Sequence, residues 1–343
     1  MKSVLIVTDA WHPQINGVVR SLERVAEVMT ARGLEVKLLT PLEFVTVPMP
    51  GYGEIRLSMT LQRSIDRKID AAAPDAIHIA TEGPLGHGAR HYCLKRGLPF
   101  ATSYHTQFPE YLRARLPVPT SWTYPILRRF HAPAEYCLVP TRSVAEALTA
   151  KGFRNCVIWS RGVDTTLFNP DRRIEGPSPE FPWPRPVFLY VGRVAVEKNI
   201  EQFLELDLPG TKVVVGDGPS RRALAERYPG VVFTGPRQGE DLARFYANAD
   251  AFVFPSRTDT FGLVLLEALA SGTPVAALPV SGPLDVLGDE RVGGLSEDLR
   301  AAALRALEIS RDACRHYAAR FSWSASADQF VQYLPEISKT AMA

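Results

Sequence analysis

Two carboxylates, Asp259 and Glu267, stand eight residues apart around the predicted start of a helix and could bind two parts of one elongated ligand. The apolar run 251–254 predicts a buried strand, so Asp259 falls in the loop before the helix. Gly262 lets a ligand approach the backbone there, beside N–H groups and a helix dipole that favour anionic groups. Glu267 lies about 7.5 Å further along the axis. A ligand with hydroxyls at both ends and phosphates between them would suit this spacing.

The same two acids also fit an ordinary surface helix. An acid near a helix start is common N-terminal chemistry, and Glu267 among leucines could face solvent. The spacing alone leaves both interpretations open, so the surrounding elements have to be considered.

A loop that combines glycine with two cations follows another predicted strand. Gly192 ends that strand, and Arg193 and Lys198 come before the next predicted helix. A diphosphate needs this combination, because glycine allows close backbone approach and the cations supply positive charge. The alternative is that both cations are ordinary solvated side chains of a loop and bind no ligand. Two more glycine loops, 216–219 and 235–236, follow strands whose carboxyl ends bind ligands in such sheets.

Two strand-end loops of the first half carry further candidates. Asn16 and Gly17 follow the strand predicted at 4–7, and His105 follows the strand predicted at 100–103. An isolated histidine is more often structural than catalytic, but His105 stands where a parallel sheet binds ligands.

Short apolar runs alternate with helical patterns along both halves of the chain. This predicts an α/β fold with two doubly wound, mostly parallel sheets. The predicted strands are 4–7, 36–39, 76–79, 100–103, 136–139, 187–191, 212–215, 231–234, 251–254 and one that begins at 275. Residues 169–186 contain six prolines and are the expected linker. We therefore expect a first domain at 1–168, a second at 187–315, and a C-terminal helix within 316–343 that crosses back to the first domain.

The composition limits the possible functions. Among 343 residues, 46% are hydrophobic and 22% charged, which is typical of a globular protein with substantial cores. The net charge of +2 argues against a bulk nucleic-acid binder. Four cysteines without metal-ligand spacing predict reduced cytoplasmic thiols. The N-terminal apolar run is too short for a signal peptide, and the longest apolar region, 261–280, falls short of an uninterrupted membrane span.

The stretch 83–134 is much more basic than the rest of the chain. It holds seven Lys or Arg and one acid, Glu110, and aromatic residues alternate with arginines over 111–134. This mixture suits the headgroup zone of an anionic bilayer, which attracts basic side chains at about 1 kcal/mol each. A core-facing helix with a solvated arginine face is the alternative that the pattern leaves open.

Taken in order, these motifs resemble glycosyltransferase family 4 over nearly the whole chain. The motifs are Asn16-Gly-Val-Val19, Ser103-Tyr-His-Thr106, Arg161-Gly-Val-Asp164, Val191-Gly-Arg193 with Lys198-Asn199, Gly216-Asp-Gly-Pro219, and the acid pair with Phe261-Gly262 between. The resemblance implies the GT-B fold, in which two Rossmann-like domains face each other across a cleft, and a retaining mechanism. The first acid of the family's E-x7-E pattern is here Asp259, one methylene shorter, which affects its contact with the sugar.

The resemblance also implies roles for individual residues. Arg193 and Lys198 would hold the donor diphosphate, Asp259 the transferred sugar, His105 the 6-position of that sugar, and Glu267 the ribose. The expected catalytic set is Arg193, Lys198, Asp259 and His105. The other expected donor-binding positions are Asn16, Gly17, Gly192, Gly216, Gly262 and Leu263. In a retaining front-face displacement the leaving phosphate can take the acceptor's proton, so the protein mainly stabilises charge. The sequence has no D-x-D motif, so we expect neither a metal nor a prosthetic group.

The donor and the acceptor follow from the resemblance alone. The stretches 103–111 and 258–262 are most similar to the lipid glycosyltransferase branch, which includes sulfolipid synthases and mannosyltransferases acting on diacylglycerol-type acceptors. We therefore expect transfer of a hexose or hexuronic acid from a UDP-sugar to a membrane lipid such as diacylglycerol. The enzyme would dock through the stretch 83–134 on the inner face of the cytoplasmic membrane.

Three alternatives remain beside this expectation. The first is a GDP-mannose-dependent mannosyltransferase, and the second is a transferase with a soluble or saccharide acceptor. The third is a non-catalytic nucleotide-sugar-binding module. A dinucleotide-binding protein is disfavoured, because no G-x-G-x-x-G follows the first strand.

Overall fold

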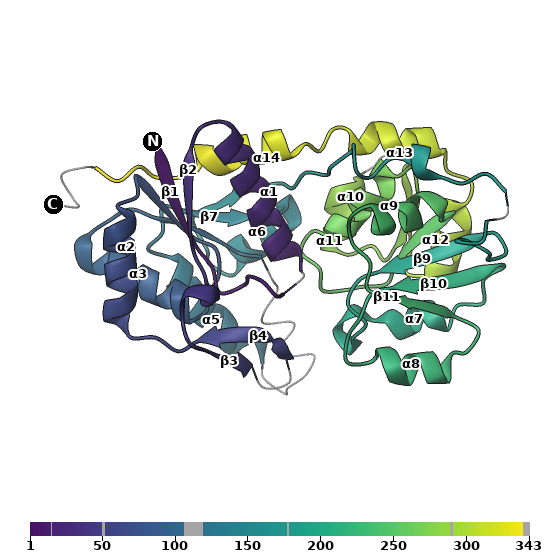
Figure 1. The fold of residues 1–343 in the computed structure, drawn as a ribbon, viewed down its shortest axis with the longest axis horizontal. Helices are drawn as coiled ribbons and strands as arrows, with labels where there is room; N and C mark the ends of the chain where they lie inside the picture. The colour runs from purple at the N-terminus through teal and green to yellow at the C-terminus, as the bar shows by residue number, and fades with distance from the viewer. Residues whose placement is uncertain (15, 50–51, 106–118, 177, 289–290, 339–343) are drawn as a thin grey trace. The chain divides into compact units, whose positions relative to one another are not determined.

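A computed structural model describes residues 1–343 except 15, 50–51, 106–118, 177, 289–290 and 339–343 (Figure 1). The described chain forms two compact units. The first consists of residues 1–161 and 323–343, and the second of residues 162–322.

The division between the units falls earlier than the linker expected at 169–186, which belongs to the second unit. Arg173 and Arg185 each place a guanidinium nitrogen 2.7 Å from Oδ1 of Asp250. The stretch contains the short 3-10 helix Pro170–Arg172, and its charged side chains attach it to the unit. Near the C-terminus, helix α13 (Arg311–Ala318) belongs to the second unit and helix α14 (Trp323–Gln332) to the first.

The first unit is built on a six-stranded parallel sheet with the order β2-β1-β5-β6-β7-β8. Its strands are β1 (Ser3–Val7), β2 (Glu35–Leu39), β5 (Ala76–Ile79), β6 (Ala101–Ser103), β7 (Tyr136–Val139) and β8 (Cys156–Ile158). The α-helices of its described residues, besides α14, are α1 (Gly17–Ala31), α2 (Gln62–Ala72), α3 (Pro84–Arg96), α5 (Thr120–His131) and α6 (Arg142–Ala150).

Strand β1 shows how this sheet is covered on both faces. All five of its residues are buried. Leu5 and Val7 join the core that α2 and α3 complete, whereas Val4 and Ile6 join the core of α1 and α14. Figure 1 shows α2 and α3 on one side of β1 and α1 on the other. Burial on both faces explains why the strand is a continuous apolar run.

The second unit repeats this plan with the order β11-β10-β9-β12-β13-β14, again all parallel. Its strands are β9 (Val187–Val191), β10 (Thr211–Val215), β11 (Val232–Gly235), β12 (Ala251–Phe254), β13 (Val275–Ala277) and β14 (Gly293–Leu295). Its helices before α13 are α7 (Ile200–Leu204), α8 (Arg221–Arg227), α9 (Gly239–Asn248), α10 (Leu263–Ala270), α11 (Ser281–Leu287) and α12 (Leu299–Ala306). Two parallel sheets with helices on their faces confirm the predicted fold class.

Every strand predicted from the sequence is present, with its ends shifted by at most one residue. The elements that were not predicted are β8, β14 and an antiparallel hairpin of β3 (Thr46–Met49) and β4 (Tyr52–Ser58). Each lacks a buried apolar run, because β8 is a partly exposed edge strand, β14 begins with two glycines, and β3 contains Pro48.

The strand orders define where a ligand is expected. In the second sheet the order reverses between β9 and β12, and in the first sheet between β1 and β5. Ligands of open α/β sheets bind outside the carboxyl ends of the strands at this switch point. The loops after β9, β12 and β1 are therefore the positions to examine.

Candidate functional site

The loops after β9 and β12 are attached to each other at the switch point of the second sheet. Lys198 Nζ lies 2.6 Å from Asp259 Oδ1, although the two residues are 61 positions apart. Asn199 Nδ2 in the first loop donates to the carbonyl oxygen of Pro255 in the second at 3.1 Å. The side chains of Lys198 and Asp259 are 17% and 22% exposed, so a ligand can reach them. The structure thus brings together two residues that the sequence predicted as site residues.

Arg193, in the same loop as Lys198, is accompanied by a buried acid that the sequence analysis did not single out. Its Nε lies 3.6 Å from Oε1 of Glu197, whose side chain is only 1% exposed. Tyr190 Oη donates to the carbonyl oxygen of Arg193 at 2.7 Å and fixes the start of the loop. A buried carboxylate is costly without a charged partner, so Glu197 and Arg193 stabilise each other. The four-residue spacing within a cationic loop was the signal that could have identified Glu197.

Gly192 and Gly216 stand where β9 and β10 end, with their backbones in contact. A Cβ atom on Gly216 would lie 1.9 Å from the carbonyl oxygen of Gly192, and the φ of Gly216 is +146°. Only glycine fits this position, and the close packing gives the two loops one shared backbone surface.

Helix α10 begins directly after the loop that carries Asp259. Gly262, with φ +85°, turns the chain into the helix, and Leu263 is the first helical residue. The first N–H groups of a helix have no partners within it, and the dipole makes this end favourable for anions. Gly262 and Leu263 thus place backbone donors close to Asp259 in the chain.

Glu267 lies inside the second unit rather than on its surface. It is 7% exposed, and its Oε2 accepts a hydrogen bond from Tyr246 Oη at 2.9 Å. Tyr246, on α9, is fully buried. The interpretation of Glu267 as a solvent-facing residue is therefore wrong. Tyr246 orients the carboxylate and was not singled out from the sequence, because nothing in the spacing links α9 to α10.

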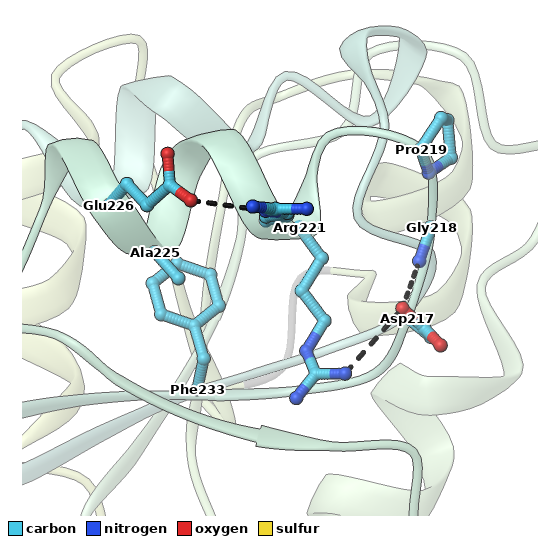
Figure 2. A pocket seen from close by; sticks show the side chains of 8 residues that line it. Asp217, Gly218, Pro219, Arg221, Ala225, Glu226 and Phe233 are labelled. Carbon is cyan, nitrogen blue, oxygen red and sulfur yellow. Dashed lines mark hydrogen bonds and ion pairs between the residues drawn. The ribbon is translucent and has the colours of Figure 1, made fainter.

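The loop after β10 opens onto a surface pocket of about 540 Å³. Figure 2 shows the side chain of Arg221, at the start of α8, directed toward Asp217, with Phe233 on its other side. Arg221 Nη1 lies 3.8 Å from Asp217 Oδ1, which also accepts a hydrogen bond from the Gly218 amide at 2.9 Å. The pocket lies beside Gly216 in the chain and extends the same edge of the sheet.

In the first unit, Asn16 and Gly17 form the start of α1. Asn16 Oδ1 accepts hydrogen bonds from the amides of Val18 and Val19 at 3.0 Å each, as a helix N-cap does. Gly17 is exposed. The predicted pair therefore presents a capped helix N-terminus at the switch point of the first sheet, where it can attract an anionic group.

His105 follows β6 and is surrounded by ring and guanidinium groups. Its Nδ1 lies 3.3 Å from Nη2 of Arg161, and its ring packs edge-on against Trp159 with the centroids 5.6 Å apart. Burial first, and then the Arg161 charge, hold the pKa of His105 well below its usual range. Arginine only donates, so Nδ1 is the acceptor and the neutral ring carries its proton on Nε2.

The basic stretch 83–134 is only partly described, because residues 106–118 lie outside the described chain and Glu110 with them. Within it, α5 has a buried face with Phe130 and an exposed face that combines apolar and basic side chains. On the exposed face, Trp122 and Ile126 are 70% and 64% exposed, and Arg129 is also exposed. The helix thus has the core-facing side and the solvated arginines of the alternative considered above, and it also exposes the large apolar side chains that suit a headgroup zone.

Two properties of the described residues concern membranes and metals. None of the helices in that part of the chain combines the length and apolar composition needed to cross a bilayer. The same residues include no group of three or more His, Cys, Asp or Glu side chains placed to hold a metal ion.

Comparisons with known proteins match both halves of the chain. Residues 15–167 match the model of Glycosyltransferase Family 4, and residues 185–312 match that of Glycosyl transferases group 1. A GDP-mannose-dependent alpha-mannosyltransferase of Mycobacterium tuberculosis is 32% identical over 84% of this chain and 82% of its own length. The alpha-monoglucosyldiacylglycerol synthase of Streptococcus pneumoniae is 25% identical over 95% of this chain and 82% of its own length.

Among solved structures, the sucrose-phosphate synthase of Thermosynechococcus elongatus superposes with a TM-score of 0.75 at 21% identity. The superposition covers 97% of this chain and 98% of that one. This likeness concerns the fold, which is that of GT-B glycosyltransferases. The chain therefore belongs to glycosyltransferase family 4 and is a hexosyltransferase with the GT-B fold.

Proposed function

We propose that this hexosyltransferase moves a hexose or hexuronic acid from a UDP-sugar to a membrane lipid of the diacylglycerol type, with retention at the anomeric carbon. The observation that carries the donor part is the contact between Lys198 and Asp259 at the switch point of the second sheet. It places a cation and an acid side by side, as a sugar diphosphate requires.

In this proposal the donor lies along the carboxyl ends of β9, β10 and β12. Arg193 and Lys198 bind the diphosphate, and Asp259 takes a hydroxyl of the transferred sugar. The amides of Gly262 and Leu263 support the phosphates at the start of α10. Glu267, held by Tyr246, accepts hydrogen bonds from the ribose hydroxyls. The backbones of Gly192 and Gly216 allow the phosphates to come close, and Asn16 and Gly17 contribute a second helix N-terminus.

The chemistry needs charge stabilisation more than a protein base. When the glycosidic bond to the diphosphate breaks, negative charge grows on the leaving phosphate, and the acceptor hydroxyl attacks from the same face. That phosphate takes the acceptor's proton. Two fixed cations, Arg193 and Lys198, stabilise the developing charge without reorganisation, which is the largest contribution that enzymes make to such steps. His105, neutral in this structure, donates a hydrogen bond to the sugar and does not carry charge.

The exposed face of α5 supports the membrane part of the proposal. Trp122 and Ile126 would enter the headgroup zone while Arg129 pairs with anionic lipids, as interfacial helices do. The relative whose name specifies diacylglycerol supports a lipid acceptor. We place the enzyme at the inner face of the cytoplasmic membrane.

A GDP-mannose donor is the second candidate, because the mycobacterial relative at 32% identity is named for it. The residues proposed for the diphosphate serve either nucleotide, so they do not distinguish the two donors.

The test offers UDP-glucose, UDP-glucuronate and GDP-mannose to the purified protein with vesicles that contain diacylglycerol, and separates the lipids by thin-layer chromatography. We expect a glycolipid from a UDP-sugar that wild type forms and the Lys198→Ala variant does not. A glycolipid formed only from GDP-mannose would show that the donor is GDP-mannose and that the UDP-sugar assignment is wrong. Products only on free saccharides would refute the lipid acceptor.

A further inference from the structure

Arg161 is a buried cation whose charge is not matched by an acid in the described part of the chain. It is 5% exposed and lies in the Arg161-Gly-Val-Asp164 motif, to which the proposed function assigns no role. Its Nη1 donates to the carbonyl oxygens of Trp159 at 2.5 Å and Ser160 at 3.3 Å, and its Nη2 lies 3.3 Å from His105 Nδ1. Its guanidinium carbon stands 3.8 Å from the centroid of the Trp159 ring. All of these partners are uncharged.

The surroundings of Arg161 offer further neutral groups rather than a counter-ion. His78 is fully buried and shares a hydrogen bond with Ser103 Oγ at 2.9 Å. Burial first, and then Arg161, lower its pKa to about 3. Burial lowers the pKa of Arg161 itself to about 9, so it stays protonated at neutral pH. A guanidinium taken out of water without an opposite charge is costly, and the described protein groups compensate only part of that cost.

A second deeply placed arginine shows what a purely structural arginine looks like in this protein. Arg311 directs its fork onto four oxygen atoms, and Asp250 is close enough to act on its charge. Arg161 has only two oxygen acceptors among the described residues and keeps donor capacity, because a guanidinium has five N–H groups.

The position of Arg161 in the sheet points to a ligand. His105 follows β6 and Arg161 follows β8, and both strands are parallel members of the sheet whose first strand leads to Asn16. The carboxyl ends of parallel strands share one edge, which is the edge that binds ligands. The small exposed part of Arg161 therefore lies at a functional edge of the first unit.

We propose that Arg161, with His105 beside it, binds an oxyanion of a substrate, namely a carboxylate, sulfonate or phosphate group other than the donor diphosphate. Guanidinium groups bind such oxyanions with two parallel hydrogen bonds. The group can belong to the transferred sugar, as in a hexuronic acid, or to the lipid headgroup. That the oxyanion is part of a substrate rests on the proposed function, whereas the anion site itself does not.

The first experiment measures anion binding without turnover. The Tm of wild type, Arg161→Gln and Arg161→Lys is followed against sulfate concentration at constant ionic strength, with exposed Arg154→Gln as the matched control. Sulfate stabilises proteins in general, so the informative quantity is the saturable part of the shift. We expect Arg161→Gln to lose part of this saturable shift, Arg161→Lys to keep more of it, and Arg154→Gln to equal wild type. The loss should also appear in a Lys198→Ala background, which removes sulfate bound at the diphosphate position. Equal saturable shifts in wild type and Arg161→Gln would overturn the proposal.

The second experiment identifies the source of the oxyanion. One arm compares kcat/KM for UDP-glucuronate and UDP-glucose, and the other compares phosphatidylglycerol and diacylglycerol in phosphatidylcholine vesicles. Arg161→Gln should reduce kcat/KM for the charged member of one pair by about 10- to 100-fold, the range of a charge-assisted hydrogen bond. The neutral member should change little. Equal losses for charged and neutral members in both arms would mean that Arg161 is a structural residue, and the proposal would be wrong.

Crystals of wild type soaked in selenate provide a measurement that does not depend on the folding of any variant. An anomalous peak within hydrogen-bond distance of the Arg161 guanidinium supports the site. Peaks at Arg193 and Lys198 with none at Arg161 overturn it. If no donor supports transfer but the anion site is present, the proposed function fails and this site stands.

Discussion

The two parallel sheets place cations at their carboxyl ends in opposite electrostatic settings. In the second unit, Lys198 lies 2.6 Å from Asp259 and Arg193 lies 3.6 Å from Glu197. In the first unit, Arg161 is surrounded by carbonyl groups, a histidine and a tryptophan ring. A cation with an acid beside it is held in position before a ligand arrives. A cation without one meets an opposite charge only when the ligand brings it.

The strand orders show a second difference between the two units. Numbered within each unit, the second sheet has the order 3-2-1-4-5-6, whereas in the first sheet the chain forms the hairpin β3–β4 where a third strand would follow β2. The switch point is present in both sheets. In the proposed function the donor binds at the switch point of the second sheet. Two loops that contact each other, those after β9 and β12, form this switch point.

The largest predicted effect concerns the cation that is paired with an acid. Lys198→Ala should lower turnover by about 100- to 1000-fold, because one fixed donor to the leaving phosphate is lost. Its Tm should change little, since the pair is partly exposed. Nucleotide release measures the first quantity and calorimetry the second. Arg315→Ala, an exposed cation of the same unit, is the control. If Lys198→Ala turns over like that control, the diphosphate assignment is wrong.

The next effect tests the buried acid of the second unit. Tyr246→Phe removes the hydrogen bond to Glu267 and should lower the free energy of unfolding by about 1.5–3 kcal/mol, the cost of a bond to a charged group. Urea unfolding measures it. Tyr228→Phe is the matched control, because Tyr228 Oη also bonds a glutamate, Glu205, but on the surface. Equal, small losses in both variants would show that the tyrosine does not hold Glu267.

A smaller effect tests whether the first unit faces lipid. Replacing Trp122 and Ile126 together by serine should weaken sedimentation with anionic vesicles by about tenfold or more, because less apolar area enters the interface. Leu307→Ser, a partly exposed leucine of the second unit, should bind vesicles like wild type. Wild type that binds neither anionic nor neutral vesicles would contradict membrane docking altogether.

The smallest effect concerns the buried His78 of the first unit, whose pKa burial and then Arg161 lower. The pKa of His78 is lowered to about 3 in the folded protein, from about 6.5 in an unfolded chain. Between about pH 6.5 and pH 3, His78 is protonated in the unfolded chain but neutral in the folded protein. The free energy of unfolding therefore falls as the pH drops below about 6.5. In His78→Gln the loss per pH unit should be smaller by up to about 1.4 kcal/mol. Urea unfolding at pH 7, 6 and 5 checks this. The same slope in both proteins would contradict a neutral His78.

Local patterns in the sequence were sufficient to predict the fold and part of the candidate site. Apolar runs such as 4–7 and 251–254 become buried strands because helices cover both faces of each sheet. Glycine and cation spacing located Arg193 and Lys198, the spacing of two acids located Asp259, and the structure joins Lys198 to Asp259. The resemblance to family 4 was confirmed by relatives that cover most of the chain.

Contacts between distant elements could not be read from the sequence. Tyr246 meets Glu267 only because α9 and α10 pack on the same face of the sheet. The uncharged partners of Arg161 among the described residues include His105, which is 56 positions away in the sequence. The expected linker at 169–186 followed from proline content, but charged side chains attach that stretch to the second unit.

The central claim is that the loops after β9 and β12 bind a nucleotide diphosphate through Arg193 and Lys198. Calorimetric titration of wild type and Lys198→Ala with UDP and with uridine tests it most directly. We predict that UDP binds wild type at least about 100-fold more tightly than uridine, as two charge-assisted contacts would give, and that Lys198→Ala loses most of this ratio. Equal affinity of wild type for UDP and uridine, with GDP behaving like guanosine, would contradict the account.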